Sequence, residues 1–111
     1  MATDGSLRSR YAAAVLELRA RVDAMRSEGA TSETIARAVH AERRRLTASF
    51  KALTPEPWCS RIHNRTLAAY GDPVGPTLEN LRARSKSWDD IIRSATRPGS
   101  RLSFERPIDN A

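Results

Sequence analysis

The sequence predicts an all-α fold, a single small domain of about five helices packed as helical hairpins. Apolar residues recur at intervals of three and four, as they do on one face of a helix, and no segment alternates over the length of a strand. Aromatic residues make up only 5% of the chain, so Leu, Ile, Val and Ala must build the core, which favours helix-on-helix packing. The 111 residues suffice for one core and leave no room for a second.

The first predicted helix runs from Leu7 to Glu28. Its apolar face repeats at helical spacing through Leu7, Tyr11, Val15, Leu18, Val22 and Met25. Gly29 is suited to end this helix, because glycine adopts the left-handed conformation that follows many helices. Residues 1–6 are small and polar, and we expect them to be disordered.

The second predicted helix starts at the N-cap Ser32 and continues to about Leu53. Its apolar face carries Ile35, Val39, Leu46 and Phe50.

The third predicted helix spans residues 55–70. Thr54 can cap it, and Pro55 suits the first helical position. We expect Trp58, Ile62 and Leu67 to face inward and Gly71 to end the helix.

Two short helices follow a turn over residues 72–76. Pro76 opens the fourth, which carries Leu78 and Leu81. Ser87 begins the fifth with a capping box, and Pro98-Gly99 ends it. The helical domain therefore covers residues 7–99, with a loose C-terminal tail over 100–111.

Residues 25–39 and 81–95 repeat one pattern without gaps: a helix end, a small-residue turn, a Ser or Thr cap, acidic first-turn residues and an isoleucine. Two capped helical hairpins explain it. The pattern also resembles the opening of helix-turn-helix modules, but acidic Asp89 and Asp90 would repel phosphate in the second copy. We favour convergence on good capping over duplication.

The charge balance is the first indication of function. The chain has 19 basic and 13 acidic residues, for a net charge of +6. Such a field favours nucleic acid, anionic lipid or an acidic protein as partner. Nearly all the basic residues are Arg, whose rigid donor fork suits phosphate.

Several classes of protein are disfavoured. No apolar run is long enough to span a membrane, and the N-terminus lacks a signal-peptide pattern, so we expect the protein in a cytoplasm, its own or that of a target cell. One cysteine and two histidines do not have zinc-ligand spacing, and Lys86-Ser87-Trp88 lacks the glycine-rich run of a phosphate loop. We expect no metal and no other cofactor.

The densest group of chemically competent residues lies between residues 58 and 72: Arg61, His63, Arg65 and Asp72. A histidine, two arginines and an acid can supply the base, the acid and the charge stabiliser for metal-independent phosphodiester cleavage. A helix with exposed arginines and a half-buried histidine is the alternative.

A second group of residues could bind phosphates without taking part in catalysis. Arg37, Arg44 and Lys51 share part of a helix face and can track a nucleic-acid backbone. Lys86 and Arg97 lie at the ends of elements and are candidate phosphate contacts. By contrast, the run from Arg43 to Arg45 is spread around about 300° of a helix and cannot address one phosphate ladder.

Residues 63–99 carry a family resemblance. The string resembles segments at the C-termini of bacterial polymorphic toxin and Rhs-type proteins, over about a third of the chain. The residues that match are Asn64, Arg65, Tyr70, Gly71, Asp72, Gly75, Pro76, Thr77, Lys86, Ser87, Trp88, Ile91, Ile92, Ser94, Arg97, Pro98 and Gly99. The chain departs from the pattern at Ser85, where a glycine is expected. The resemblance implies an effector delivered into a rival cell, often a nuclease, with an immunity protein as a potential partner.

The sequence thus leaves three functions open. The first is a toxin-like effector domain that acts on nucleic acid, with Arg61, His63, Arg65 and Asp72 as the catalytic group. The second is a non-enzymatic helical module that binds nucleic acid or a protein through its Arg-rich face. The third is an adaptor whose apolar helix faces pair with another chain.

Overall fold

The computed structural model describes residues 3–98 and confirms the all-α prediction. Over that range the chain forms five helices: α1 (Thr3–Ser27), α2 (Ser32–Ala52), α3 (Trp58–Tyr70), α4 (Leu78–Ala83) and α5 (Trp88–Ala95). No helix among these residues is long and apolar enough to cross a membrane. The predicted loose tail over 100–111 lies outside the described residues.

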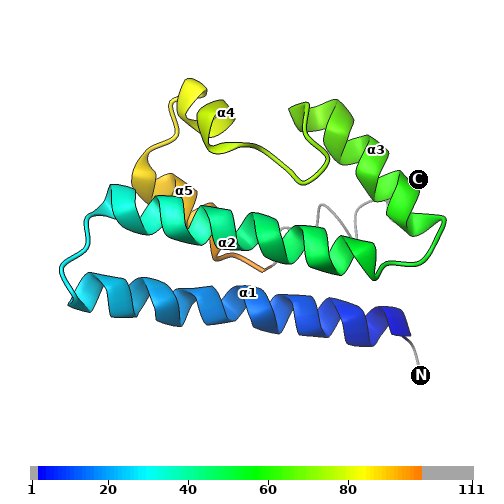
Figure 1. Ribbon diagram of the computed structural model, residues 1–111, viewed down its shortest axis with the longest axis horizontal. Helices are drawn as coiled ribbons and strands as arrows, with labels where there is room; N and C mark the ends of the chain where they lie inside the picture. Colours follow the sequence, from blue (N-terminus) through cyan, green and yellow to red (C-terminus); the bar gives the residue numbers. More distant parts are fainter. Residues whose placement is uncertain (1–2, 99–111) are drawn as a thin grey trace.

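The helix α2 is the centre of the molecule. Figure 1 shows α1 and α2 as a long antiparallel pair, with α3 and α4 on the side of α2 that faces away from α1. A buried hydrophobic cluster joins Val22 of α1 and Val39 of α2 to Ile91 and Ile92 of α5. A second contact lies nearer the start of α1, where the Tyr11 ring meets Phe50 edge-on, with centroids 5.3 Å apart. The two contacts fix α1 and α5 firmly to α2.

The helix starts differ from the sequence prediction at several points. Helix α1 begins at Thr3, so residues 3–6 belong to it instead of preceding it, and residues 1–2 lie outside the described range. The N-cap of α2 is Thr31, not Ser32, because the Thr31 hydroxyl accepts the Thr34 N–H. Likewise, Thr77 caps α4 in place of the predicted start at Pro76.

Helix α3 begins at Trp58, three residues later than predicted. Pro57 disfavours helical backbone at the residue before it, which delays the start. Thr54 does not cap α3; its hydroxyl donates to the Phe50 carbonyl at the end of α2, at 2.9 Å. Gly71 ends α3 in the left-handed conformation, as predicted.

The inward face of α3 is narrower than the sequence suggested. Ile62 is buried and Trp58 is half-buried, but Leu67 is 42% exposed, so its predicted inward orientation is wrong. The thiol of Cys59 is half-buried and donates to the Lys51 carbonyl at 3.4 Å. Helix α3 is therefore held to α2 by a small apolar contact.

The predicted capping box of α5 is confirmed. The Ser87 hydroxyl accepts the Asp90 N–H at 3.0 Å, and the Asp90 carboxylate accepts the Ser87 N–H at 3.2 Å. The helix ends at Ala95, with Thr96 as its C-cap, before the predicted stop at Pro98.

Candidate functional site

The turn between α3 and α4 is fastened to α2 by Arg44. One guanidinium nitrogen, Nη2, lies 3.2 Å from each carboxylate oxygen of Asp72. The other, Nη1, donates to the carbonyls of Gly75 and Pro76, at 3.0 and 3.3 Å. Arg44 and Asp72, predicted as phosphate contact and catalytic acid, thus hold this turn in place.

The carboxylate of Asp72 is set up to remain ionised. The backbone N–H of Val74 donates to Oδ1 at 2.9 Å, and this hydrogen bond is the main cause that lowers the pKa of Asp72. The Arg44 guanidinium lowers it further, and so does the charge of Lys51. An acid of lowered pKa favours charge pairing over proton donation near neutral pH.

His40 joins the same turn from the interior. Its Nε2 lies 3.1 Å from the Pro76 carbonyl oxygen, which can only accept, so Nε2 carries the proton. Burial lowers the pKa of His40, with the charges of Arg44 and Arg43 acting in the same direction, and the bond to Pro76 opposes them. His40 is therefore neutral near pH 7, with Nδ1 as an acceptor.

Arg43 closes the C-terminal end of α5. Its Nη1 donates to the carbonyls of Ala95, Ser94 and Arg97 at 2.8, 3.2 and 3.2 Å, and its Nε donates to the Tyr11 hydroxyl at 2.9 Å. Because the last carbonyls of a helix have no partner within the helix, a cation that binds several of them stabilises the helix end.

His63 faces α2 and the turn. Its Nδ1 lies 2.8 Å from the Lys51 ammonium, which also donates to the Pro73 carbonyl at 3.0 Å. Lys51 and His63 were assigned to different predicted groups, and folding brings them together. Asp72 lies close enough to Lys51 for the lysine charge to lower its pKa, but its hydrogen bonds go to Arg44 and Val74.

Arg61 and Arg65 are exposed on the opposite side of α3 from His63, as the 100° turn per residue requires. The Arg61 guanidinium lies 5.0 Å from the centroid of the Trp58 ring. Asn64 is exposed on the same side, and we call Arg61, Asn64 and Arg65 the α3 outer face. The four predicted catalytic residues therefore divide among three places: the α3 outer face, the Lys51–His63 contact and the Arg44–Asp72 pair.

The remaining predicted phosphate contacts also separate. Arg37 pairs with Glu33 at 2.9 Å and lies 5.2 Å from the Trp88 ring centroid. Lys86 and Arg97 are exposed and line one hollow of about 250 Å³ beside α5. Of these three residues, folding brings only Lys86 and Arg97 to a common hollow.

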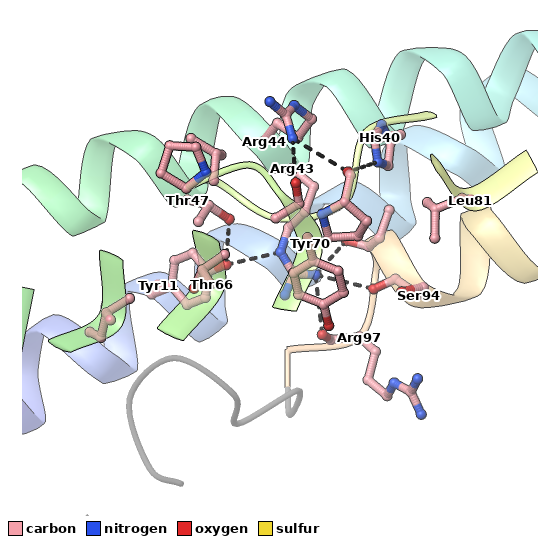
Figure 2. A pocket seen from close by; sticks show the side chains of 16 residues that line it. Tyr11, His40, Arg43, Arg44, Thr47, Thr66, Tyr70, Leu81, Ser94 and Arg97 are labelled. Carbon is pink, nitrogen blue, oxygen red and sulfur yellow. Dashed lines mark hydrogen bonds between the residues drawn. The ribbon is translucent and has the colours of Figure 1, made fainter. Parts of the chain in front are cut away.

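A larger cleft, of about 310 Å³, lies between α2, α3, the turn and α5 (Figure 2). We call it the α2–α3 cleft; its polar lining includes His40, Arg43, Arg44, Thr66, Tyr70 and Arg97. None of the described residues that line it is Asp or Glu. Arg61, His63 and Arg65 are not among the residues that line the cleft, so the cleft is separate from these three predicted catalytic residues.

Sequence reasoning missed His40, Arg43 and Tyr70 as cleft residues. A signal was present for the first two, because His40 follows Ala36 by four residues and Arg43 follows Val39 by four. Both therefore continue the buried face of α2. The predicted apolar face of this helix does not include them, because both residues are polar. Tyr70 carried no such signal, since its environment depends on where the turn folds back.

Comparisons of this chain with protein-family models, with curated proteins and with solved structures find no match. Among residues 3–98, no three His, Cys, Asp or Glu side chains are grouped so that they could hold a metal ion. The function must therefore be argued from the described surfaces themselves.

Proposed function

We propose that this protein binds nucleic acid non-enzymatically, through the α3 outer face. The observation that carries the proposal is that α3 presents two neighbouring exposed arginines without an acidic residue on the same helix. Within the described part of the chain, Arg26, Arg37, Arg44, Arg45 and Arg93 each pair with a carboxylate. Arg61 and Arg65 form no such pair with any described residue, and α3 contains no acidic residue.

The chemistry of this face suits a phosphate backbone. Arg61 and Arg65 are one helical turn apart, so their side chains emerge as neighbours and can reach adjacent phosphates. Stacking on Trp58 orients the Arg61 guanidinium and leaves its N–H edge accessible to a phosphate oxygen. Asn64 adds a donor and an acceptor beside them. The net charge of +6 would speed the encounter with a polyanion.

The test compares two double variants that remove equal charge. Arg61→Ala/Arg65→Ala removes the α3 outer face, whereas Arg37→Ala/Arg45→Ala removes two exposed arginines that are paired with acids. Binding to single-stranded RNA and duplex DNA is measured by fluorescence anisotropy at several salt concentrations. We expect the first variant to bind about tenfold more weakly and to lower the salt slope by between one and two, and the second to change little.

Two results would contradict the proposal. Wild-type protein that binds neither nucleic acid at low salt removes it outright. Equal losses in both double variants would mean that net charge, not the α3 outer face, determines binding.

A second candidate is a toxin-like nuclease, and one contact favours it. The Lys51 ammonium lies 2.8 Å from Nδ1 of His63, which combines a proton-transfer group with a cation able to stabilise a phosphorane-like transition state. In this form of the hypothesis Lys51 takes the place of Arg61 and Arg65, which lie across the helix. The resemblance to polymorphic toxin segments adds the expectation that the target is the nucleic acid of a rival cell.

The nuclease candidate is tested by incubating purified protein with RNA and DNA, and by expressing it in a bacterial cytoplasm. We expect cleavage and growth arrest that His63→Ala abolishes. Intact nucleic acid after incubation with wild-type protein, with and without divalent metal, would eliminate the nuclease and leave the binding proposal standing.

A further inference from the structure

Trp58 and Arg61 form a stack at the start of α3 that is open on one side. The guanidinium carbon of Arg61 lies 5.0 Å from the centroid of the Trp58 ring. Trp58 is half-buried, so the fold fixes the position of the indole, whereas Arg61 is exposed. Within residues 3–98, no ion pair and no second ring contacts this guanidinium. Because a guanidinium group is planar, the face turned away from Trp58 can receive a further flat group.

The other tryptophan of the chain carries a stack that the fold itself fills. The guanidinium carbons of Arg82 and Arg37 lie 3.9 and 5.2 Å from the centroid of the Trp88 ring. Arg82 also donates to the Lys86 carbonyl at 2.9 Å. Arg37 also pairs with the Glu33 carboxylate at 2.9 Å. The stack at the start of α3 has no such additional partners among the described residues, which leaves it available to a ligand.

An unpaired nucleic-acid base fits the open face of the Arg61 guanidinium. Bases stack on aromatic rings and on guanidinium planes, and every base has a face that can do so. In a duplex the neighbouring base pairs cover both faces of each base, so a base must leave the helix before it can stack elsewhere. The open face therefore suits a single strand.

Reading of a duplex through the major groove is the alternative for this helix. Arginine and asparagine side chains can bind base edges there. Such contacts need side chains that extend from the helix toward the floor of the groove. The contact with Trp58 instead holds the Arg61 guanidinium beside the helix, which favours a single strand over a duplex.

The next turn of α3 supplies a phosphate contact. Arg65 follows Arg61 by four residues, which places it about 6 Å further along the helix axis. A phosphate that adjoins the stacked base can thus reach the Arg65 guanidinium. The exposed amide of Asn64 lies beside these two residues and can bind a base edge or a ribose hydroxyl.

We propose that the α3 outer face binds single-stranded nucleic acid, with one unpaired base stacked on the Arg61 guanidinium and the adjoining phosphate bound by Arg65. The inference rests on the proposed function and names the class of nucleic acid that this surface binds. Single strands of RNA and of DNA share the base and the phosphate, so the test includes both.

The experiment measures binding of full-length protein to fluorescein-labelled strands of about ten nucleotides by fluorescence anisotropy. The probes are a uridine strand, a deoxyuridine strand, an abasic strand with the same number of phosphates, and a duplex. We expect the uridine and deoxyuridine strands to bind at least about fivefold more tightly than the abasic strand, because only they can stack a base.

The deciding variant is Arg61→Lys, which keeps the charge and removes the planar group. We expect it to weaken binding of the uridine strand about fivefold and to leave the affinities for the abasic strand and the duplex, and the salt slope, unchanged. Arg82→Lys is the matched control, since it makes the same change at an arginine stacked on Trp88, and should leave every affinity unchanged. Thermal unfolding of each variant checks that the fold is retained.

Equal affinity of wild-type protein for the uridine and abasic strands would overturn the inference. So would an Arg61→Lys variant that loses affinity for the uridine strand and the duplex alike. Either result leaves phosphate binding by the α3 outer face standing, whereas the proposed function itself fails if wild-type protein binds none of the probes. Tighter binding of uridine than of deoxyuridine that Asn64→Ala abolishes identifies RNA as the ligand, and equal binding identifies the base and phosphate as the groups recognised.

Discussion

Three consecutive arginines of α2 have three different structural roles. Arg43 binds the carbonyls that end α5, Arg44 binds the turn after α3, and Arg45 is exposed and pairs with Glu42 one turn before it. The basic run, which the sequence spreads around about 300° of a helix, thus consists of two arginines that bind backbone carbonyls elsewhere in the fold and one surface residue. Residue type alone does not distinguish these roles, because the carbonyls that Arg43 and Arg44 bind are about 30 to 50 residues away along the chain.

We predict that Arg43→Ala lowers the free energy of unfolding by about 2–3 kcal/mol, since it removes a charged donor from the partly buried Ala95 carbonyl and Tyr11 hydroxyl. Arg45→Ala, the matched control one position away, should change it by less than about 0.5 kcal/mol, as exposed ion pairs contribute little. Urea denaturation monitored by circular dichroism measures both. Similar effects at the two positions would show that Arg43 does not hold α5.

His40 predicts a pH dependence of stability. Its folded-state pKa lies below the ordinary value of 6.5, mainly through burial, so the unfolded chain binds more protons between the two values. The contribution of His40 to the free energy of unfolding is therefore fully present above pH 6.5, and it is lost as the pH decreases through the folded-state pKa. Asp72, also of lowered pKa, acts in the same direction, but only below its ordinary 3.8.

His40→Gln separates the histidine contribution from the rest. The glutamine amide can donate to the Pro76 carbonyl and does not titrate. Urea unfolding between pH 7.5 and about 5 should show a smaller loss of stability in this variant than in wild type. A decline in His40→Gln as steep as in wild type would assign the dependence to other groups.

At the scale of elements, the repeated pattern of residues 25–39 and 81–95 forms the same turn twice. Ala30 donates to the Met25 carbonyl and Gly29 to that of Arg26; at the corresponding places Lys86 donates to Leu81 and Ser85 to Arg82. These are the two hydrogen bonds of a Schellman ending. The residue after each helix has positive φ, 88° at Gly29 and 64° at Ser85. Identical capping chemistry accounts for the repeat without duplication.

In the second turn Ser85 has left-handed backbone, a conformation that disfavours residues with a Cβ. Ser85→Gly should raise the free energy of unfolding by about 0.5–1 kcal/mol, because a Cβ is strained in left-handed backbone and the Ser85 side chain is exposed. Ser85→Ala keeps the Cβ and should give no gain. Equal stability of the two variants in chemical denaturation would rule out strain at this position.

Local chemistry explains which elements the sequence could predict. Gly71, the Ser87 capping box and the buried stripe through Ile35 and Val39 depend on neighbours within one or two turns, and all are as expected. The inward orientation of Leu67 depended on how much of α3 the rest of the molecule covers, which no local pattern states. The geometry of the candidate site was harder still to predict from the sequence, because every contact of Asp72 and His63 with α2 joins residues at least 12 positions apart.

At the scale of the whole molecule, positive charge has two uses. Part of it is internal, as at Arg43 and Arg44, where guanidinium groups bind partly buried backbone carbonyls. The remainder is exposed, on the α3 outer face, around Lys86 and Arg97, and on α1 at residues such as Arg10 and Arg21. A net charge of +6 therefore overstates the cations available to a partner, because some guanidinium groups already bind backbone carbonyls.

The unequal attachment of the helices gives the last prediction. Helix α3 buries only Ile62 fully, whereas α2 buries four residues and packs against both α1 and α5. Local opening costs least where little apolar surface is buried, so α3 amides should exchange with deuterium faster than those in the middle of α2. If the α3 outer face binds nucleic acid, saturating RNA should slow exchange in α3 and leave α1 unchanged, because ligand binding stabilises the structure that it contacts. If RNA instead raises protection evenly across α1 and α3, binding is diffuse over the whole basic surface. If the α3 and α2 amides of the free protein exchange equally slowly, the loose attachment of α3 is contradicted.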